Sequence, residues 1–260
     1  MPISYEKSEG IATITIDNPP VNVFTPVLHK ELYNILKDFN ADSSIRCGIL
    51  TGAGDRAFCA GDDIKTPRAE RSRAETVERY LAPRQEDEPL EYPGWETEIM
   101  TMQRYKPIIG AVNGVCVGQG MVYLMHLTDL RYAAPEARFG MPEIAYGMGG
   151  AGGALSLGKM MPHVAAMELL LLGEMFSAKK AKRTFLINGV IEKENLLSHA
   201  QKVAEKIASH PPIGVRTEME AYQRSLDMSR ADALSYAGNF YRLIRSVQST
   251  VPPLAQKGKE

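Results

Sequence analysis

The sequence predicts an α/β domain followed by a helical C-terminal third. Up to about residue 150, short β-branched or apolar runs alternate with stretches of helical periodicity, as in domains built from strands and helices in turn. Beyond Ala154 the alternation stops and helical patterns take over almost completely. A chain of 260 residues is long enough to bury a sizeable core, so one large domain with a helical extension is the simplest expectation.

The first third begins with a strand and a helix. Residues 11–16 form a β-branched alternating run that a proline-containing turn then ends, which is typical of a strand. Thr25 followed by Pro26 has the form of an N-cap with proline at the first helical position, and apolar residues at helical spacing extend the expected helix to about Asn40. Two further strands are predicted, over 45–51 and over 58–61.

The middle third is interrupted by a charged segment. From Thr66 to Trp95 the chain carries many charges, prolines at positions 83, 89 and 93, and the acidic stretch Glu86 to Glu88, a composition that predicts a long surface loop or lid. After it the alternation resumes around the glycine turn Gly118-Gln119-Gly120. The predicted elements are helices over 96–105 and 121–127 and strands over 108–112, 115–117 and 130–133.

The C-terminal third is predicted to be helical. Lys193 to Ser209 is its clearest amphipathic stretch, and two more helices are expected before Val251-Pro252-Pro253 ends the order. The charged tail beyond these prolines is expected to be mobile or to form an arm onto a neighbouring chain.

Composition and charge exclude several classes of partner. Lys and Arg number 30 against 31 for Asp and Glu, so there is no excess of positive charge to attract nucleic acid or an anionic membrane. No apolar run approaches the roughly 18 residues of a membrane helix, and the first residues lack the pattern of a signal peptide. Cys47, Cys59 and Cys116 lie in apolar runs without paired spacing, which favours reduced thiols and a cytoplasmic location over disulfides or zinc ligands.

Three sequence blocks carry a resemblance to a known family. They are Phe58-Cys59-Ala60-Gly61-Asp62-Asp63-Ile64, the stretch from Lys106-Pro107 to Gly120, and Phe139-Gly140-Met141-Pro142-Glu143. In this order they resemble the enoyl-CoA hydratase/isomerase (crotonase) superfamily, with coverage from about residue 3 to 250. The resemblance implies a crotonase-like spiral of ββα turns with two roughly perpendicular sheets over residues 1–195, including a variable loop over 66–95. It also implies a helical oligomerisation region over 196–260 that assembles a trimer or a dimer of trimers.

Members of this family stabilise the enolate of an acyl-CoA thioester, with coenzyme A as part of the substrate and no further cofactor. Two backbone N–H groups aimed at the thioester oxygen are a preorganised way to hold its negative charge. By resemblance the two donors are the N–H groups of Asp62 and Gln119, although the family commonly has glycine at the position of Gln119. Gly61, Gly118 and Gly120 would let the main chain approach the substrate, while each of them alone has the form of an ordinary turn glycine.

Proton transfer falls to Glu143 in this resemblance. The family's hydratases use two glutamates to hold and deprotonate a water; Glu143 matches the second, and Val122 stands at the position of the first. A single carboxylate suits the isomerases, in which one base moves a proton from one carbon to another. Hydration stays open if Glu96, Glu98 or Tyr146 takes the missing role. If apolar walls surround Glu143, its pKa should rise toward the range of a general base.

The expected substrate-binding residues flank these groups. They are Ala60, Gly61, Asp63, Ile64, Lys65, Gly118, Gly120, Val122 and Tyr146. Asp63 is expected to cap the helix or turn that starts at Ile64, and Lys65 either reaches a phosphate of coenzyme A or stays solvated. For Tyr123 and Tyr146 core packing is the favoured role. The five histidines show no pairing typical of a metal site, and none is assigned chemistry.

Several other functions compete with this interpretation. Residues 147–152 satisfy the Gly-x-Gly-x-x-Gly dinucleotide fingerprint, but the proline-containing segment before them does not predict the buried strand that the fingerprint needs. Asp62 and Asp63 point their side chains apart and have no third ligand at a recognisable spacing, so no metal site is expected. The same enolate chemistry would also serve an acyl-CoA hydrolase or a decarboxylase. A non-catalytic acyl-CoA-binding protein is the alternative outside enzymes.

Overall fold

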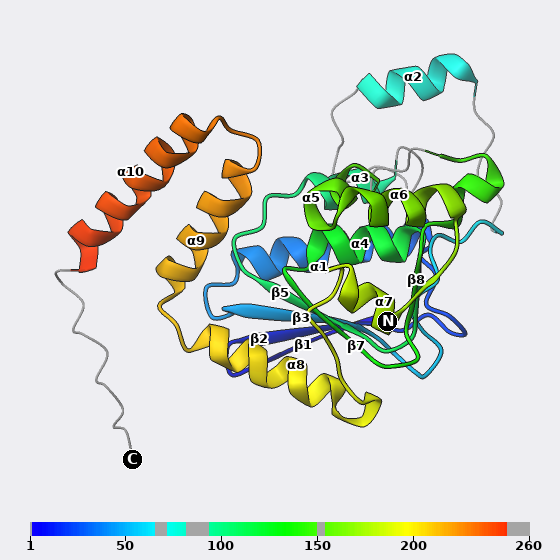
Figure 1. Ribbon diagram of the computed structural model, residues 1–260, viewed down its shortest axis with the longest axis horizontal. Coiled ribbons are helices and arrows are strands. Elements are labelled where there is room, and N and C mark those ends of the chain that lie inside the picture. Colours follow the sequence, from blue (N-terminus) through cyan, green and yellow to red (C-terminus); the bar gives the residue numbers. More distant parts are fainter. Residues whose placement is uncertain (1, 66–71, 82–93, 150–153, 249–260) are drawn as a thin grey trace.

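The computed structural model describes residues 2–65, 72–81, 94–149 and 154–248, whose strands form two sheets with helices packed against them (Figure 1). The strands are β1 (Ile3–Ser8), β2 (Ile11–Ile16), β3 (Cys47–Gly52), β4 (Ala57–Cys59), β5 (Ile108–Val112), β6 (Val115–Val117), β7 (Leu130–Ala133), β8 (Arg138–Gly140), β9 (Phe176–Ser177) and β10 (Gly189–Val190). The helices are α1 (Pro26–Ala41), α2 (Arg73–Leu81), α3 (Trp95–Thr101), α4 (Gln119–Leu127), the 3-10 helix η1 (Pro142–Tyr146), α5 (Ala154–Met160), α6 (His163–Leu172), α7 (Ala178–Arg183), α8 (Lys193–Ala208), α9 (Pro212–Ser225) and α10 (Arg230–Gln248).

Successive strand pairs divide themselves between the two sheets. The larger sheet has the order β1-β2-β3-β5-β7-β10 and the smaller one the order β4-β6-β8-β9. In the pairs β3–β4, β5–β6 and β7–β8, the first strand joins the larger sheet and the second joins the smaller one. The chain therefore adds one strand to each sheet per turn. Within the larger sheet β2, β3, β5 and β7 are parallel neighbours, and within the smaller sheet β4, β6 and β8 are. The pairs β1–β2 and β8–β9 are antiparallel.

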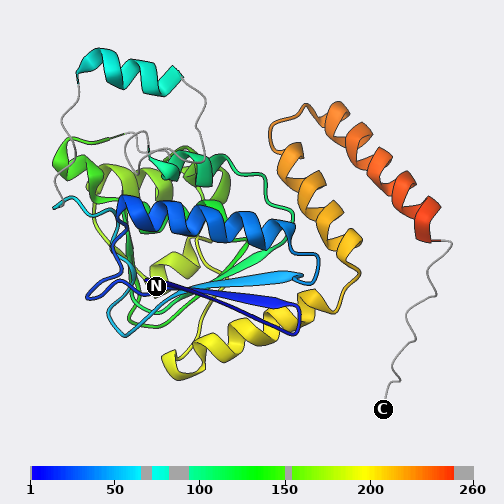
Figure 2. The same cartoon turned by 180° about the vertical axis from the view of Figure 1, so that it is seen from behind.

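The larger sheet is covered on both faces, with α1 and α8 on opposite sides (Figure 2). On one face Leu50 and Ile108 join the core cluster that includes α1 and α4, and on the other Ile49 and Ile109 pack with Leu196 of α8. Parallel strands that are buried on both faces need apolar or small residues at consecutive positions. This requirement explains why every residue of β3 and of β5 is buried.

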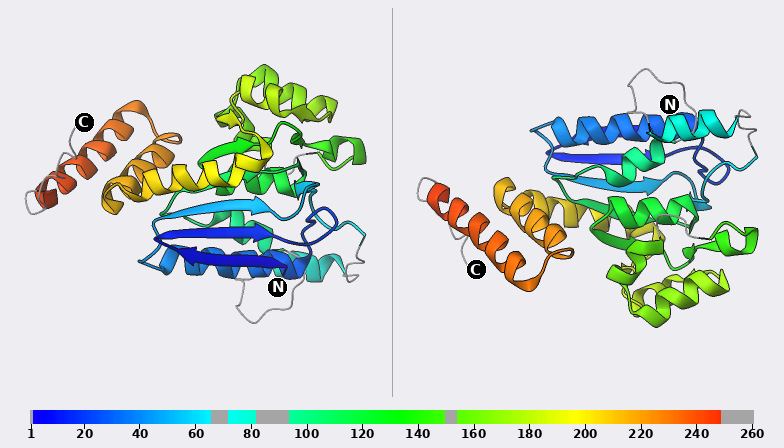
Figure 3. Two further views of the ribbon diagram at one scale, coloured as in Figure 1. Left: turned by 90° about the horizontal axis from the view of Figure 1, so that it is seen from below. Right: turned by 90° about the horizontal axis from the view of Figure 1, so that it is seen from above.

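The two C-terminal helices differ from the rest of the molecule. Helices α9 and α10 pack against each other and project from the body in all views (Figures 1 and 3). No residue of α9 is buried, whereas α8 buries Leu196, Ala200 and Ala204 against the larger sheet. The domain boundary expected at residue 196 falls inside α8 and stays a prediction.

Most predicted elements appear at or near their expected limits. Strands β2, β5, β6 and β7 have the predicted bounds, and α1 begins at Pro26 with the Leu28 amide donating to Oγ1 of Thr25 (3.3 Å). Strand β1 was not predicted, because it lies at the edge of the sheet and its last three residues are exposed. The two-residue strands β9 and β10 interrupt the C-terminal region that was expected to be helical.

The segment from Thr66 to Trp95 is not wholly a loop, as the sequence had suggested. Residues 73–81 form α2, and Ser72 and Glu75 explain why: the amide of Ser72 donates to Oε2 of Glu75 (2.8 Å), and the amide of Glu75 donates to Oγ of Ser72 (3.2 Å). This reciprocal pair is a capping box, which starts a helix despite the surrounding charge. Residues 66–71 and 82–93, and the tail from 249, lie outside the described residues.

Candidate active site

The three sequence blocks meet at one edge of the smaller sheet. Strands β4, β6 and β8, which lead into the blocks' functional residues, are parallel neighbours in that order. Because the carboxyl ends of parallel strands share one edge of a sheet, the segments that follow these strands come together there. Gly61, Gly118 and Glu143 lie in these segments, although up to 82 positions separate them in the sequence (143 − 61).

Gly61 and Gly118 face each other in backbone conformations that favour glycine. The φ angle is +98° at Gly61 and +57° at Gly118, where a Cβ atom introduces strain. A methyl group built on Gly61 would lie 3.6 Å from the amide nitrogen of Gln119, and one built on Gly118 would lie 3.6 Å from Cα of Gly61. At Gly120 a methyl group would come within 2.4 Å of the carbonyl oxygen of Cys59. Gly120 therefore has a steric reason to be glycine, whereas at Gly61 and Gly118 glycine is favoured by the positive φ angle.

The amides of Asp62 and Gln119 point away from the neighbouring backbone hydrogen bonds. In a trans peptide, N–H points opposite to the C=O of the preceding residue. The carbonyl before Asp62 accepts from the amide of Phe24 (2.8 Å), so the amide of Asp62 points away from Phe24. The carbonyl before Gln119 accepts from the amide of Val122 (3.0 Å), so the amide of Gln119 points out of the N-terminal end of α4. The helix dipole favours negative charge at that end.

Glu143 approaches the same glycines from the third block. It is the second residue of η1, and its Oε1 would lie 3.6 Å from a methyl group built on Gly118. Its Oε2 is buried and has no hydrogen-bond partner among the described residues. Burial raises the pKa of the Glu143 carboxyl above its ordinary value, its own backbone amide opposes the rise, and the charge of Asp62 adds to it. A carboxyl in this state can accept and release a proton.

A buried polar chain, which we call the relay, connects the side chains of Asp62 and Gln119. Oδ1 of Asp62 lies 3.0 Å from Nε2 of His29, and Nδ1 of His29 lies 2.5 Å from the hydroxyl of Tyr123. Burial raises the pKa of Tyr123 well above its ordinary value, and the side-chain amide of Gln119, beside the same hydroxyl, opposes the rise. Nε2 of Gln119 itself is buried and meets no partner at hydrogen-bond geometry in the described ranges.

Sequence reasoning assigned no role to His29. The histidine is 4% exposed and lies with Leu28 and Leu32 on the buried face of α1. A buried imidazole needs hydrogen-bond partners, so its position on the apolar face of the predicted helix was a signal that polar groups lay opposite. Helical spacing could not name those partners, because Tyr123 is 94 positions away.

The remaining predicted substrate-binding residues differ in exposure. Tyr146 is 66% exposed, so it does not pack in the core as expected, and Ile64 is 71% exposed. Lys65 is also exposed, and its amide donates to Oδ1 of Asp63 (2.9 Å), so Asp63 caps a turn rather than a helix. Val122 is only 2% exposed and belongs to the core cluster.

The carboxylates considered as substitutes for a second glutamate point to different places. The charge of Glu96 contributes to the raised pKa of Tyr123, so Glu96 lies near the relay. Glu98 instead lines a cavity of about 490 Å³ together with Tyr33.

Ala60, another of the predicted substrate-binding residues, is partly buried, and its amide donates to a backbone carbonyl at 3.0 Å.

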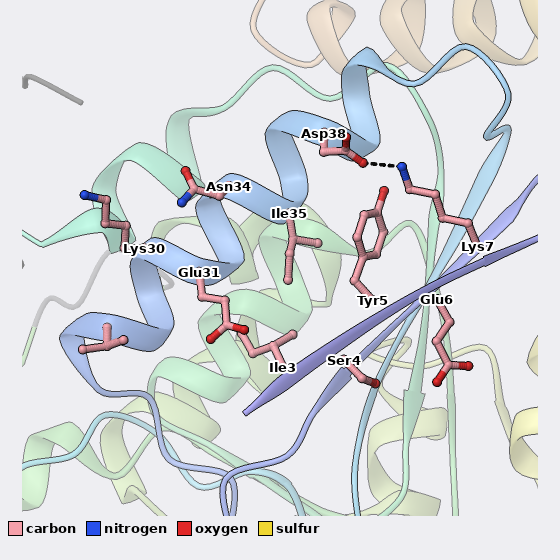
Figure 4. Close-up of a pocket in the computed structure, with 11 residues that line it drawn as sticks. Ile3, Ser4, Tyr5, Glu6, Lys7, Lys30, Glu31, Asn34, Ile35 and Asp38 are labelled. Atoms are coloured by element: carbon pink, nitrogen blue, oxygen red, sulfur yellow. Dashed lines mark hydrogen bonds and ion pairs between the residues drawn. The ribbon is translucent and has the colours of Figure 1, made fainter. Parts of the chain in front are cut away.

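A larger cavity, of about 960 Å³, lies between β1 and α1 (Figure 4). Its described lining residues include none of the predicted site residues. Beside it the Lys7 ammonium pairs with the carboxylate of Asp38 at 2.5 Å, as the dashed line in Figure 4 marks. This hollow is separate from the edge where the three blocks meet.

The described residues also bear on the metal and dinucleotide sites that the sequence raised. No group of three or more His, Cys, Asp or Glu side chains is placed to hold a metal within the parts of the chain that the structure describes. The segment before the glycines at 147–149 is the 3-10 helix η1 and not the parallel strand of a dinucleotide site; residues 150–152 lie outside the described ranges. Over those ranges no helix has the length and apolar character to cross a bilayer.

Comparison with known proteins places these features in a wider context. A family model described as enoyl-CoA hydratase/isomerase matches residues 6–251. The chain is 33% identical to (E)-benzylidenesuccinyl-CoA hydratase of Thauera aromatica over 95% of this chain and 92% of that protein. It is 30% identical to short-chain-enoyl-CoA hydratase of Clostridium acetobutylicum over 90% of this chain and 85% of that protein. The crystal structure of an enoyl-CoA hydratase from Bacillus anthracis matches with a TM-score of 0.81 and 30% identity, covering 95% of this chain and 92% of that one.

Proposed function

We propose a reaction for this chain on the premise that it belongs to the enoyl-CoA hydratase/isomerase family and is an enzyme that processes acyl-CoA thioesters. The proposed reaction is the addition of water to the double bond of a 2-enoyl-CoA, or the reverse elimination of water, with Glu143 as the proton carrier. The observation that carries the proposal is the position of Glu143, whose Oε1 lies beside Gly118 while Gly118 faces Gly61. The carboxyl thus stands at the junction of the two turns that present the amides of Asp62 and Gln119.

The two amides stabilise the negative oxygen of the thioester as the enolate forms. Both belong to peptide groups whose carbonyls are held by the amides of Phe24 and Val122, so the donors are fixed before substrate arrives. Such a donor is typically worth roughly 10² to 10³ in rate. The N-terminal end of α4 adds a favourable field at Gln119.

Glu143 moves one proton in the addition. Water gives its oxygen to the β-carbon and one proton to Glu143, which passes that proton to the α-carbon; the second hydrogen stays on the new hydroxyl. The raised pKa of the Glu143 carboxyl supports this role, because its carboxylate is then a stronger base toward water and a larger fraction of the carboxyl carries a proton to donate near neutral pH.

Double-bond migration is the second candidate reaction. It is favoured by Val122, which stands at the position of the family's first glutamate, is 2% exposed and can neither accept a proton nor orient a water. Hydration is favoured by the names of two relatives, the (E)-benzylidenesuccinyl-CoA and short-chain-enoyl-CoA hydratases. Analysis of products from a 3-enoyl-CoA and a 2-enoyl-CoA separates the two reactions.

Binding, assembly and location complete the proposal. Residues 60–65, Gly118, Gly120, Val122 and Tyr146 surround the thioester, and coenzyme A, as part of the substrate, is the only cofactor required. The paired helices α9 and α10 carry exposed Tyr222, Leu234 and Tyr241, which supports their use as the interface of a trimer or a dimer of trimers. The three buried, unpaired cysteines support a cytoplasmic location.

Replacing Glu143 by glutamine tests the proposal most directly. We expect Glu143→Gln to keep its fold and its affinity for coenzyme A thioesters while hydration falls by about 10³-fold, since the proton carrier is lost. The measurement is the absorbance change of 2-enoyl-CoA thioesters of four to ten carbons and of cinnamoyl-CoA. Glu136→Gln, at an exposed position, serves as the control. A near-normal rate in Glu143→Gln would remove Glu143 from the mechanism.

A further inference from the structure

We propose that the side chain of Asp62 is the second carboxylate of this site, and that it orients the attacking water in place of the glutamate that Val122 replaces. The inference rests on the proposed hydration and supplies what a lone Glu143 leaves missing, a group that fixes the water's direction. Asp62 would then act twice, through its backbone amide on the thioester oxygen and through its carboxylate on the water.

The position of Asp62 satisfies the first requirement, which is to border the reacting atoms. Its amide points away from Phe24, it directly follows Gly61, and the charge of its carboxylate acts on Glu143. Its side chain is 29% exposed, so it is held by the protein and still open on one side. Val122, the residue at the glutamate position, has no such opening.

The relay holds the carboxylate of Asp62 in one direction. A carboxylate only accepts hydrogen bonds, so Nε2 of His29 donates to Oδ1 of Asp62. In a neutral imidazole Nδ1 then accepts, and the hydroxyl of Tyr123 donates to it. The side-chain amide of Gln119 lies behind that hydroxyl. The hydroxyl of Tyr123 and Nε2 of His29 thus both donate in the direction of Asp62.

Aromatic packing fixes the relay mechanically. The ring of Phe24 stacks on His29 with centroids 5.1 Å apart and an interplanar angle of 25°. The same ring meets Tyr123 edge-on at 4.9 Å and 84°. The backbone of Phe24 also forms a β-bridge with Asp62, so Phe24 positions both partners of the hydrogen bond between His29 and Asp62.

The two carboxyls have environments suited to different tasks. Glu143 is desolvated, one of its oxygens has no partner in the described ranges, and its pKa is raised partly by the charge of Asp62. Asp62 instead receives a hydrogen bond from His29. When the environments of two neighbouring carboxyls differ in this way, one can carry the proton and the other can remain an acceptor.

The step balances with water as the only co-reactant. One O–H of the water donates a hydrogen bond to the carboxylate of Asp62 and stays intact. The oxygen attacks the β-carbon as the other proton moves to Glu143, and Glu143 delivers that proton to the α-carbon. A carboxylate offers about four acceptor positions, so the bond from His29 is compatible with one from water.

Two assays on one variant separate this role from the enolate chemistry. Asp62→Asn keeps the backbone amide and the size of the side chain. We expect it to hydrate crotonyl-CoA and cinnamoyl-CoA roughly 100-fold more slowly than the wild type, while deuterium exchange at the α-carbon of butyryl-CoA in heavy water stays within about threefold. Asp55→Asn, an exposed aspartate paired with Lys193, is the matched control.

Further variants decide between Asp62 and its competitors. Tyr123→Phe keeps the packed ring and removes the donor to His29, so we expect hydration to fall by about tenfold with exchange unchanged. Normal hydration in Asp62→Asn, loss of hydration in Glu96→Gln instead, or equal loss of hydration and exchange in Asp62→Asn would overturn the assignment. Unchanged hydration in Tyr123→Phe would remove the relay from the account.

The outcomes also separate this inference from the proposed function. Normal hydration in Asp62→Asn would overturn the role of Asp62 alone and leave the proposed hydration intact, whereas a wild-type enzyme that exchanges the α-protons but never hydrates would overturn both. Exchange that persists in Glu143→Gln would overturn the proposed proton carrier, whatever Asp62→Asn does.

Discussion

Helix α4 has a polar network at each end, and the two networks differ in how completely they are hydrogen-bonded. Beyond its C-terminal end, Arg131 is 8% exposed and donates to the carbonyls of Met125, Thr128 and Leu186 and to Oγ1 of Thr128, at 2.9 to 3.3 Å. At its N-terminal end, Nε2 of Gln119 is buried without a partner among the described residues, as is Oε2 of the nearby Glu143.

The difference agrees with a structural role for the Arg131 network and with the catalytic role proposed for the N-terminal one. Buried polar groups in folded proteins are nearly always satisfied, because an unpaired one costs free energy. The Arg131 network follows this rule, because the Arg131 guanidinium donates a hydrogen bond to each of the three carbonyls. The N-terminal network departs from the rule at two atoms among the described residues, Nε2 of Gln119 and Oε2 of Glu143, and the other carboxyl oxygen of Glu143 lies beside Gly118.

Breaking the satisfied network should give the largest loss of stability. Arg131→Met leaves the carbonyls of Met125, Thr128 and Leu186 without donors, and each orphaned buried carbonyl costs about 1–3 kcal/mol, so we expect a loss of roughly 3 kcal/mol or more. Urea unfolding measures it. Arg138→Met is the control, since Arg138 also donates to two carbonyls but is exposed, and should cost below about 1 kcal/mol. Equal losses in the two variants would show that burial of the network does not matter.

A methyl group between the glycines should stop chemistry with a smaller loss of stability. Gly118 has φ +57°, and Gly54 has φ +73° with no atom within 4 Å of a built methyl group. Alanine at either position should cost about 1–2 kcal/mol in backbone strain. Only Gly118→Ala places the methyl group beside Glu143 and Gly61, so we expect a further loss of turnover of roughly 100-fold that Gly54→Ala does not share. Similar activity in both variants would contradict the position assigned to the substrate.

The main-chain part of the site could be predicted from the sequence. Gly61 and Gly118 announce unusual backbone conformations by their identity, and the short strands before them predict that they share a sheet edge. The same holds for α1, whose start is encoded locally by Thr25 and Pro26. Local signals fail at β1, because an edge strand with exposed polar residues lacks the buried alternation that marks a strand.

The side-chain part could not be predicted, because it depends on contacts between distant segments. His29 and Tyr123 each belong to an apolar helix face, where sequence reasoning expects packing and not a hydrogen bond between them. The helix α2 shows a different failure: the capping box of Ser72 and Glu75 was present, but the charge and proline content of the surrounding segment outweighed it in the prediction.

The smallest expected effect is on stability: Glu143→Gln, which should lose activity, should be slightly more stable than the wild type at high pH. Unfolded, the Glu143 carboxyl titrates near its ordinary value of 4.5, and burial raises its pKa in the folded enzyme. Between these two values the folded state binds more protons, so the wild type loses stability as the pH rises through this window. Glu143→Gln does not titrate and should melt higher at pH 8, by less than about 3 °C, with the difference vanishing as the pH falls to 4.5.

Melting curves between pH 4.5 and 8 measure this effect, with the exposed Glu136→Gln expected to follow the wild type throughout. A Glu143→Gln variant less stable than the wild type at pH 8 would mean that the carboxylate has a stabilising partner, contrary to its bare Oε2. The sign distinguishes the two ends of α4. Removing Arg131 costs stability because its partners lose their donor, whereas removing the charge of Glu143 relieves the cost of burying that charge.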